Sequence, residues 1–321
     1  MPPTRALSLR AILILATTLV IGGGCNRSRQ TIIKPMSALR PQATFTVNGH
    51  PDWMAIAPGS VWVTSSAADL VSQLRATDNQ PGIAIPVSKP CSGLAVGFGS
   101  IWIPSCGKGT LVRADLNTGM IQATIPIGPA DSEGGITIGA GSVWLMTDSS
   151  GVLSRIDPTS NTAVATISIP SGSFCPLFAD GFVWITSTEH NVLTKVDPST
   201  DRAVLQIPVG KNPRFLTYGA DSIWTLNQAD GTITRISTKT DQRLADISTH
   251  IPGHGGEISF GFGSVWATVA KKPITRVDAA TSTVTSRWVG AGGDSIRTGL
   301  GSVWLTDYDG GKIWRLSPAS L

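Results

Sequence analysis

Short apolar runs separated by polar turn residues fill most of this 321-residue chain. The runs are rich in Val, Ile, Thr and Trp, and Gly, Pro, Asn, Asp and Ser bound them. Few stretches show the apolar period of 3.6 residues that an amphipathic helix needs. β-Branched and aromatic runs bounded by turn residues are typical of strands. The pattern therefore predicts an all-β protein.

One four-residue phrase, Gly-Ser-Val-Trp, occurs four times, at residues 59–62, 141–144, 263–266 and 301–304. Three related phrases end at Trp102, Trp184 and Trp224. The seven tryptophans follow one another at intervals of 38 to 42 residues. A fixed period of this length indicates a repeat architecture.

Each repeat contains four short strand patterns. In the second repeat we expect strands over 93–96, 101–103, 111–114 and 121–127, with tight turns between them. Four antiparallel strands in about 40–45 residues are typical of a β-propeller blade. Seven copies predict a seven-bladed β-propeller. The last repeat lacks a fourth strand, and residues 43–47 are expected to supply it and close the ring.

The repeat phrases, followed by Arg-Ile-Asp-Pro-Thr and Ala-Thr-Ile, resemble the YVTN-type and virginiamycin B lyase-like (streptogramin lyase-like) propellers. The resemblance covers about residues 42–318. It implies the seven-bladed fold and leaves the activity open, because function depends on sites placed on a fold. The Gly-His and Trp-Asp signature of WD40 blades is missing.

The first 24 residues are typical of an export signal: Arg5 and Arg10 precede an apolar run over 11–21, which Gly22-Gly23-Gly24 follows. Cys25 after these small residues resembles the lipidated cysteine of bacterial lipoproteins. We therefore expect an exported, lipid-anchored protein in the cell envelope; ordinary signal cleavage and an uncleaved anchor are the alternatives. The predicted organisation is an export signal over 1–24, a basic tether over 25–41 and one propeller domain over 42–321.

The basic pI near 9.0 comes from the N-terminal region and not from the predicted domain. Six of the 25 basic residues, and none of the 21 acidic ones, lie before residue 41. A nucleic-acid binder should carry a basic cluster on its folded domain, and no such cluster is visible. We therefore expect no nucleic-acid partner. The expected partner is a protein, peptide or small polar ligand, and we expect a monomer.

Polar and charged residues with possible chemical roles lie where each first strand begins and each second strand ends. These positions face one rim of a propeller. The residues predicted to line this rim are Asp52, Trp53, Glu133, Arg214, Glu257, Asp294, Asp307 and Tyr308. Close carboxylates raise one another's pKa or recruit a cation. Two interpretations of this rim stay open: a polar-ligand or cation site, and an ordinary solvated rim. For Trp53 the alternatives are stacking on a ligand and packing between blades.

The sharpest local cluster is His254-Gly255-Gly256-Glu257, because an imidazole beside a carboxylate can act as a base. The resemblance implies a divalent cation, a His about eleven residues before a blade Trp and a Glu three after one. In this chain Gly255 and Gly293 stand at the first position, with His254 adjacent, and Asp307 stands three after Trp304. His254 and Glu257 are thus the candidate catalytic pair, and Glu257, Asp294 and Asp307 the candidate ligands of Mg²⁺ or Ca²⁺, although no cofactor is certain.

Two further features are expected to be structural. Cys91 and Cys106 flank adjacent strands of the second blade, so a disulfide is plausible, whereas Cys175 would be left over as a buried or a reactive thiol. A basic residue recurs on the third strands, which we expect to pair with turn acids such as Asp157 or Asp197; the series is Arg113, Arg155, Lys195, Arg235, Arg276 and Arg315.

Two functions fit these observations. The first is a non-catalytic exported propeller that binds a partner through one channel rim. The alternative is a cation-dependent lyase, similar to the streptogramin lyases that open a cyclic depsipeptide by elimination, or another hydrolase-like enzyme at the same rim. Whether the chain is an enzyme stays open at this point.

Overall fold

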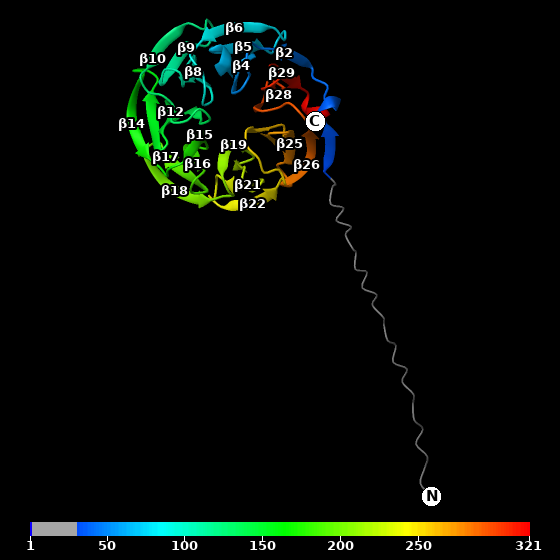
Figure 1. Cartoon of the computed structure of the whole chain (residues 1–321). Helices are drawn as coiled ribbons and strands as arrows, with labels where there is room; N and C mark the ends of the chain where they lie inside the picture. The colour runs from blue at the N-terminus through cyan, green and yellow to red at the C-terminus, as the bar shows by residue number, and fades with distance from the viewer. Residues whose placement is uncertain (2–30) are drawn as a thin grey trace. The chain divides into compact units, whose positions relative to one another are not determined.

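Seven four-stranded antiparallel units surround a central channel in the computed structural model, which describes residue 1 and residues 31–321 (Figure 1). The predicted all-β, seven-bladed propeller is confirmed. Residues 31–321 form one compact unit. The predicted export signal beyond residue 1, and Cys25, lie outside the described residues. Within the part that the structure describes, no helix is long and apolar enough to cross a membrane.

The blades follow one another along the chain. Blade one is β3 (Met54–Ala57), β4 (Ser60–Ser65), β5 (Leu70–Arg75) and β6 (Pro81–Pro86). Blade two is β7 (Ala95–Gly97), β8 (Ser100–Ser105), β9 (Thr110–Asp115) and β10 (Ile121–Ile125). Blade three is β11 (Ile136–Gly139), β12 (Ser142–Asp148), β13 (Val152–Asp157) and β14 (Thr162–Ser168). Blade four is β15 (Ser173–Ala179), β16 (Phe182–Ser187), β17 (Val192–Asp197) and β18 (Arg202–Pro208).

The remaining blades repeat the scheme. Blade five is β19 (Pro213–Gly219), β20 (Ser222–Asn227), β21 (Thr232–Ser237) and β22 (Arg243–Ser248). Blade six is β23 (Ile258–Gly261), β24 (Ser264–Val269), β25 (Lys272–Asp278) and β26 (Thr283–Val289). Blade seven is β27 (Ile296–Gly299), β28 (Ser302–Asp307), β29 (Lys312–Leu316) and β2 (Ala43–Thr46). The short 3₁₀ segments are η1 (Met36–Ala38), η2 (Ser66–Ala68) and η3 (Pro318–Ser320).

The predicted ring closure is present. β2 pairs antiparallel with β29, from Ala43 opposite Arg315 to Thr46 opposite Lys312 (Figure 1). Phe45 is buried from this strand and lies 5.9 Å from the ring centre of Trp304. One strand from the start of the domain thus completes the last blade and leaves no open seam.

A further strand, which the sequence did not predict, lies within the expected tether. β1 (Ile32–Pro35) pairs parallel with β26, so blade six has five strands. The Thr31 hydroxyl donates to the Val284 carbonyl, near the start of β26. The chain therefore joins the propeller at the end of blade six where the Gly-Ser turns lie, and runs along β1 toward the opposite rim.

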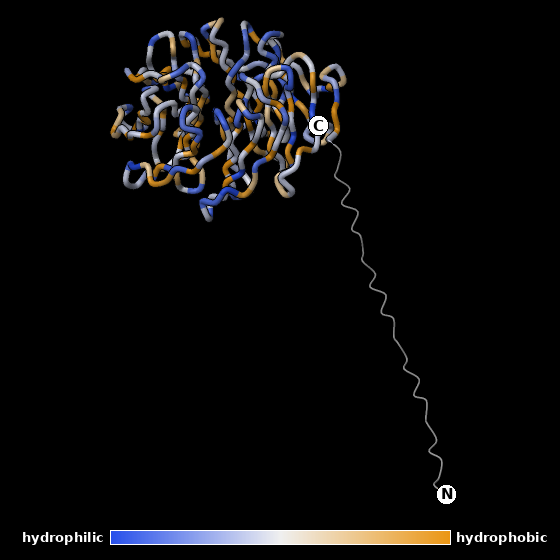
Figure 2. Tube along the Cα trace, turned by 60° about the horizontal axis from the view of Figure 1, so that its bottom comes forward, coloured by the Kyte–Doolittle hydropathy of each residue, from blue (hydrophilic) through white to orange (hydrophobic). Residues whose placement is uncertain are grey.

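The repeated phrase forms a tight turn and then the start of a buried strand. In blade six Phe262 (φ 54°) and Gly263 (φ 68°) form a two-residue turn, and positive φ at the second position favours glycine. Val265 and Trp266 then begin a strand that is fully buried. The Trp266 indole donates to the Gly261 carbonyl at 3.0 Å. Hydrophobic and hydrophilic stretches are interspersed throughout the propeller (Figure 2).

The serine of the phrase anchors the recurrent basic residue of the third strand. Arg235 donates to the Ser222 hydroxyl at 3.0 Å, lies over the Trp224 ring and reaches the Ala279 carbonyl and Ser282 of the next blade. The predicted pairing with turn acids is present for two of the basic residues: Arg155 forms an ion pair with Asp201 and Lys195 with Asp241, each on the next blade. Asp157 and Asp197 are not the partners, because these carboxylates accept from backbone N–H groups of their own turns. Five of the six basic residues are thus clamps between neighbouring blades, whereas the side-chain hydrogen bond of Arg276 stays within blade six.

Candidate functional site at the channel mouth

The rim where the first strands begin carries the candidate site, and we call it the mouth rim. Here a threonine two positions after the blade tryptophan holds the first strand of three blades. The Thr64, Thr268 and Thr306 hydroxyls accept from the backbone N–H groups of Trp53 (3.0 Å), Glu257 (2.6 Å) and Ser295 (2.8 Å). These bonds fix Asp52, Glu257 and Asp294 at the start of the innermost strands.

Asp52 and Asp294, on neighbouring blades one and seven, form an interacting carboxyl pair, in which each acid shifts the pKa of the other. Burial raises the pKa of Asp52 well above its usual range, and the charges of Asp294, Glu133 and Glu257 raise it further. Burial also raises the pKa of Asp294, although the Gly256 N–H, which donates at 2.9 Å, opposes this. Because Asp294 raises the pKa of Asp52 while Asp52 lowers that of Asp294, the two carboxyls titrate as a coupled pair in which Asp52 is the weaker acid.

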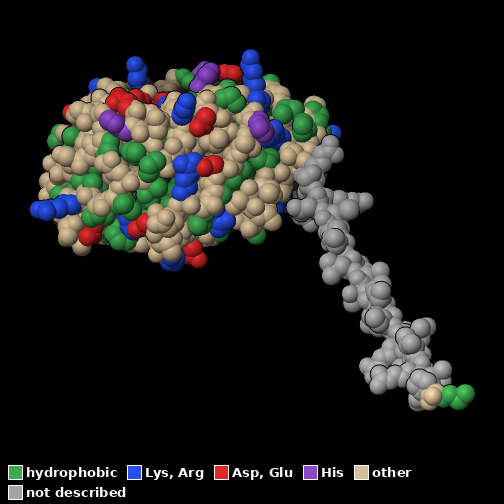
Figure 3. Space-filling model, turned by 90° about the horizontal axis from the view of Figure 1, so that it is seen from below, with side chains coloured by type: hydrophobic (Ala, Val, Ile, Leu, Met, Phe, Trp, Pro, Cys, Tyr) green, Lys and Arg blue, Asp and Glu red, His purple; other side chains and the backbone are tan. Residues whose placement is uncertain are grey.

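Two more groups complete the rim of the mouth. Burial raises the pKa of Glu133, and Arg214 partly offsets this. Tyr308 also has a raised pKa, through burial and then through the charges of Asp52, Asp294 and Glu133. The His50 ring stacks on Tyr308 at 4.7 Å between ring centres, and its Nδ1 lies 2.9 Å from the Tyr308 carbonyl oxygen. Histidines in the view of Figure 3 lie toward one rim of the ring.

An aromatic cluster lies beneath the mouth. Trp53 packs edge-on against Phe215 at 5.7 Å, and Phe215 against Phe174 at 5.7 Å. The guanidinium of Arg214 lies 4.4 Å from the Phe174 ring centre. Trp53 is 3% exposed, so its role includes packing. Its indole N–H, however, has no hydrogen-bond partner among the described residues.

A cavity of about 160 Å³ adjoins this cluster, and residues from all seven blades line it. Glu257 lies in it, buried, where its carboxylate accepts from Arg297 and from the Ser295 hydroxyl. Burial raises the pKa of Glu257, and the charge of Arg297 opposes the shift. The Cys175 thiol also lines the cavity, and burial raises its pKa to about 12, so it is protonated at neutral pH.

Two predicted site residues lie apart from this group. His254 is exposed, whereas the Glu257 carboxylate is bound by Arg297 and Ser295. Asp307 lines a separate cleft between blades six and seven and accepts from the Gly310 N–H at 3.2 Å. Across residues 31–321, no three His, Cys, Asp or Glu side chains are grouped so as to hold one metal ion. In this conformation Glu257, Asp294 and Asp307 thus do not form a shared ligand set.

The structure also shows site residues that sequence reasoning missed. Arg297, Ser295, His50, Phe174 and Phe215 all contact predicted site residues. The threonines that hold the first strands did have a sequence signal, since Thr follows the blade Trp by two in blades one, four, six and seven. His50 gave no signal, because its partner Tyr308 lies 258 residues away in the chain. Cys91 and Cys106 form a disulfide beside the mouth rim, with 6.0 Å between Cα atoms.

The fold has known counterparts. No protein-family model matches the chain, and no curated protein sequence matches it. A solved structure of streptogramin B lyase matches with a TM-score of 0.71 at 20% identity, covering 85% of this chain and 96% of the lyase. Virginiamycin B lyase from Staphylococcus aureus matches with a TM-score of 0.71 at 19% identity, covering 86% and 98%.

A functionally different protein matches equally well. Kuenenia stuttgartiensis hydrazine synthase has a TM-score of 0.73 at 13% identity, covering 86% of this chain and 97% of that one. The resemblance to the lyase-like propellers is thus confirmed as a fold type. Because both enzymes share the architecture, the activity must be argued from the site.

Proposed function

We propose that this protein is an exported binding module that captures a positively charged ligand, such as a basic peptide segment, at its channel mouth. The observation that carries the proposal is the carboxyl pair of Asp52 and Asp294, with Glu133 close enough to raise the pKa of Asp52. Crowded, partly buried carboxylates repel one another, and a bound cation removes that repulsion.

The arginine side chains near the mouth already interact with acidic or aromatic residues of the protein. Arg297 is paired with the buried Glu257, and Arg214 is stacked on Phe174 while it offsets the charge of Glu133. The Asp52–Asp294 pair has no basic partner among the described residues, and Asp309 adds further negative charge. A lysine or arginine side chain would supply the missing charge.

The route of the chain favours an open mouth. Thr31 joins blade six near Val284, at the end opposite the mouth rim. If Cys25 is lipidated, only the few residues between it and Thr31 connect the lipid to the propeller, which at most ~3.5 Å per residue is a short tether. The mouth would then be on the side away from the attachment point and accessible to a partner.

Binding can be tested with N-acetyl-tetralysine amide as the probe and tetraglutamate as its opposite-charge control. We expect saturable binding of tetralysine by calorimetry, weaker at high salt because the attraction is electrostatic. The variant Asp294→Asn should weaken it by about tenfold, since one close charge pair contributes on the order of 1.4 kcal/mol. The matched control Asp157→Asn removes a carboxylate from a distant turn and should leave binding unchanged. Equal binding of both peptides, or no binding, would reject the proposal.

Export and anchoring require a separate experiment. We expect the protein in the membrane fraction of the cell envelope, with globomycin-sensitive processing, and release of the Cys25→Ser variant from the membrane. Wild-type protein found free in the periplasm or medium would reject the lipid anchor and leave ordinary signal cleavage.

An enzymatic alternative is supported by the same carboxyl pair, because an acid with a raised pKa can donate a proton near neutral pH. The similarity to streptogramin lyases is a similarity of fold. A ring-opening assay with a streptogramin B substrate, with and without Mg²⁺ or Ca²⁺, tests this reading against the variants Glu257→Gln and His254→Ala. Turnover that depends on a divalent cation and on Glu257 would favour the lyase over the binding module.

A further inference from the structure

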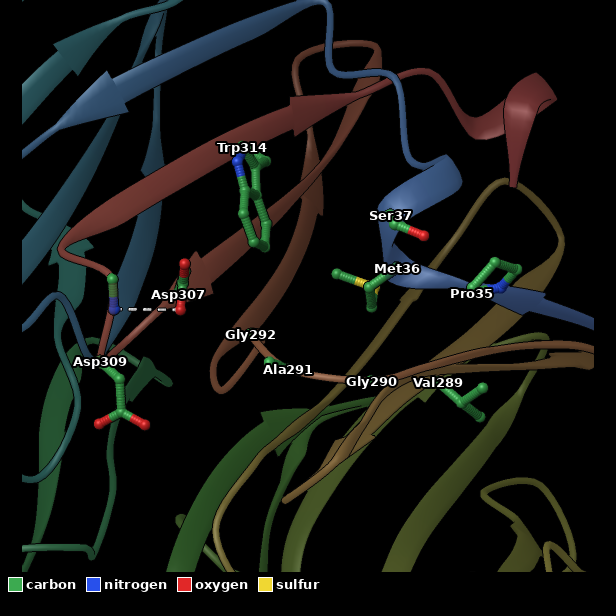
Figure 4. Close-up of a pocket in the computed structure, with 11 residues that line it drawn as sticks. Pro35, Met36, Ser37, Val289, Gly290, Ala291, Gly292, Asp307, Asp309 and Trp314 are labelled. Atoms are coloured by element: carbon green, nitrogen blue, oxygen red, sulfur yellow. Dashed lines mark hydrogen bonds between the residues drawn. The ribbon is translucent and has the colours of Figure 1, made fainter.

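A second hollow lies outside the channel, between blades six and seven. It has a volume of about 710 Å³, and the segments that line it are Pro35–Ser37, Val289–Gly292, Asp307, Asp309–Gly310 and Trp314 (Figure 4). Pockets that hold small ligands typically have volumes of about 300–1,000 Å³. None of these residues belongs to the Asp52–Asp294 pair or to the cavity with Glu257, so this cleft is a separate candidate site.

The walls of the cleft are apolar and come from distant parts of the chain. The Trp314 side chain of β29 lies between Asp307 on one side and Met36 of η1 on the other (Figure 4). Both Trp314 and Met36 pack against the buried cluster that includes Trp288 and Leu305. Of the ten tryptophans, all of which lie in the described residues, Trp314 alone is not buried.

Glycines keep the floor of the cleft open. A Cβ atom at Gly292 (φ 89°) would lie 2.8 Å from Cη2 of Trp314 and 3.5 Å from Cγ of Asp307. A Cβ atom at Gly290 (φ 132°) would lie 3.4 Å from Cβ of Met36. Side chains at these positions would therefore occupy the space between the indole and the opposite wall.

The charged side chains that line the cleft are acidic. Asp307 and Asp309 line it, and no Lys, Arg or His does so. Neither carboxylate takes part in an ion pair within residues 31–321. Seven other tryptophan rings have a Lys or Arg over them, namely Trp102, Trp144, Trp184, Trp224, Trp266, Trp288 and Trp304. In the same described range, Trp314 has no such cation.

We propose that this cleft binds an organic ammonium ion, a cation whose body is apolar. An indole next to carboxylates attracts such a group through cation–π and charge–charge interactions, while the methyl or methylene groups contact Met36 and the indole. A hydrated metal ion would gain nothing from the apolar walls. The inference goes beyond the proposed function, because it concerns a different site with its own residues.

Choline and its uncharged isostere 3,3-dimethylbutan-1-ol are the probes, because they differ in charge and hardly in shape. We expect choline to change the tryptophan fluorescence saturably, with a Kd of about 1–10 mM for so small a ligand. The alcohol should bind at least tenfold more weakly, because it lacks the charge that both the indole and the carboxylates attract. Equal responses to the two probes, or no saturable response to choline up to about 50 mM, would overturn the proposal.

Variants locate the site. Asp307→Asn should weaken choline binding by about fivefold to tenfold without disturbing the core, since the carboxylate lies at the cleft surface. Trp314→Leu should abolish the fluorescence change and weaken binding measured by calorimetry. Asp52→Asn at the channel mouth should leave choline binding unchanged, which separates a failure here from a failure of the peptide-binding proposal. Unchanged choline affinity in Asp307→Asn and Trp314→Leu would place the probe elsewhere and reject this site.

Discussion

Asp52 of blade one and Asp294 of blade seven face each other next to the ring closure as a carboxyl pair, and the charge of Asp294 adds to burial in raising the pKa of Asp52. The two residues are 242 positions apart in a chain whose repeat places both at the start of a first strand. The closing strand β2, which completes blade seven, is followed directly by blade one and thereby brings them together.

This pair predicts how stability depends on pH. The pKa of Asp52 is higher in the folded protein than the value of about 3.9 expected when unfolded. Protonation therefore favours the folded state, and the free energy of unfolding should fall as the pH rises from about 4 through the raised pKa. Asp52→Asn removes the titrating group and keeps the size of the side chain, so its pH dependence should be flatter. We expect its Tm at pH 8 to exceed that of the wild type by about 2–4 °C.

Thermal unfolding at several pH values checks this prediction, with Asp307→Asn as the control, because that carboxylate lies outside the pair. A wild-type protein whose stability rises steadily from pH 4 to pH 8, with Asp52→Asn following the same curve, would show that folding does not raise the pKa of Asp52.

The Glu257–Arg297 ion pair should behave as a buried pair. Glu257 is 4% exposed, so Arg297→Ala leaves an uncompensated charge, and we expect a loss of about 3 kcal/mol in the free energy of unfolding. The double variant Arg297→Ala/Glu257→Gln removes both charges and should recover most of the loss. Denaturant unfolding of the single and double variants measures the coupling. Additive effects would mean that the two side chains are independent.

The clamp residues should contribute more to the free energy of unfolding than ordinary surface charges do. Arg235→Ala removes contacts to Ser222 and Ser282 and the stacking on Trp224, and we expect a loss of about 1–3 kcal/mol. Lys239, an exposed partner of Asp180, is the matched control, and Lys239→Ala should have no measurable effect. Similar denaturation midpoints for the two variants would reject the clamp role.

Cys175 should be slow to react with thiol reagents. Its thiol is surrounded by the inner strands, and its pKa of about 12 leaves almost no thiolate at neutral pH. In the Cys25→Ser variant, an aromatic disulfide reagent should modify one thiol only after unfolding, since Cys91 and Cys106 are bonded to each other. Rapid modification of the native protein would show that the cavity is open to solvent.

The fold was predictable because it depends on local rules that the chain applies seven times. Turn geometry selects the glycine before six of the seven second strands, as at Gly263, with Asp221 in this place in blade five, and burial on both faces selects residues such as Trp266. Exact strand ends were less predictable: β7 begins at Ala95, two residues later than expected. β1 gave no signal, because its partner β26 is about 250 residues away and its own run is only four residues long.

The site was predictable only where the repeat itself sets the position. Asp52 and Asp294 stand at equivalent places in their blades, and Glu257 stands one position later, at the place of Trp53 and Ser295. Charge interactions link these three acids and Glu133 in the structure. His254 is two to three residues away from such a place, in a glycine-rich loop, and its side chain is exposed. Asp307 is at the expected place but lines the outer cleft, where its carboxylate accepts from the Gly310 N–H. Which way a rim side chain points depends on loop contacts that the repeat does not encode.

The most direct test of the proposed binding module is proton release on binding. Titrating N-acetyl-tetralysine amide at about pH 6 in two buffers of different ionisation enthalpy gives the number of protons exchanged per ligand. A cation at the mouth should ionise the Asp52–Asp294 pair, so we predict release that approaches one proton in the wild type and release close to zero in Asp52→Asn. Binding with no proton exchange in the wild type, or with the same release in Asp52→Asn, would contradict the assignment of the mouth as the cation site.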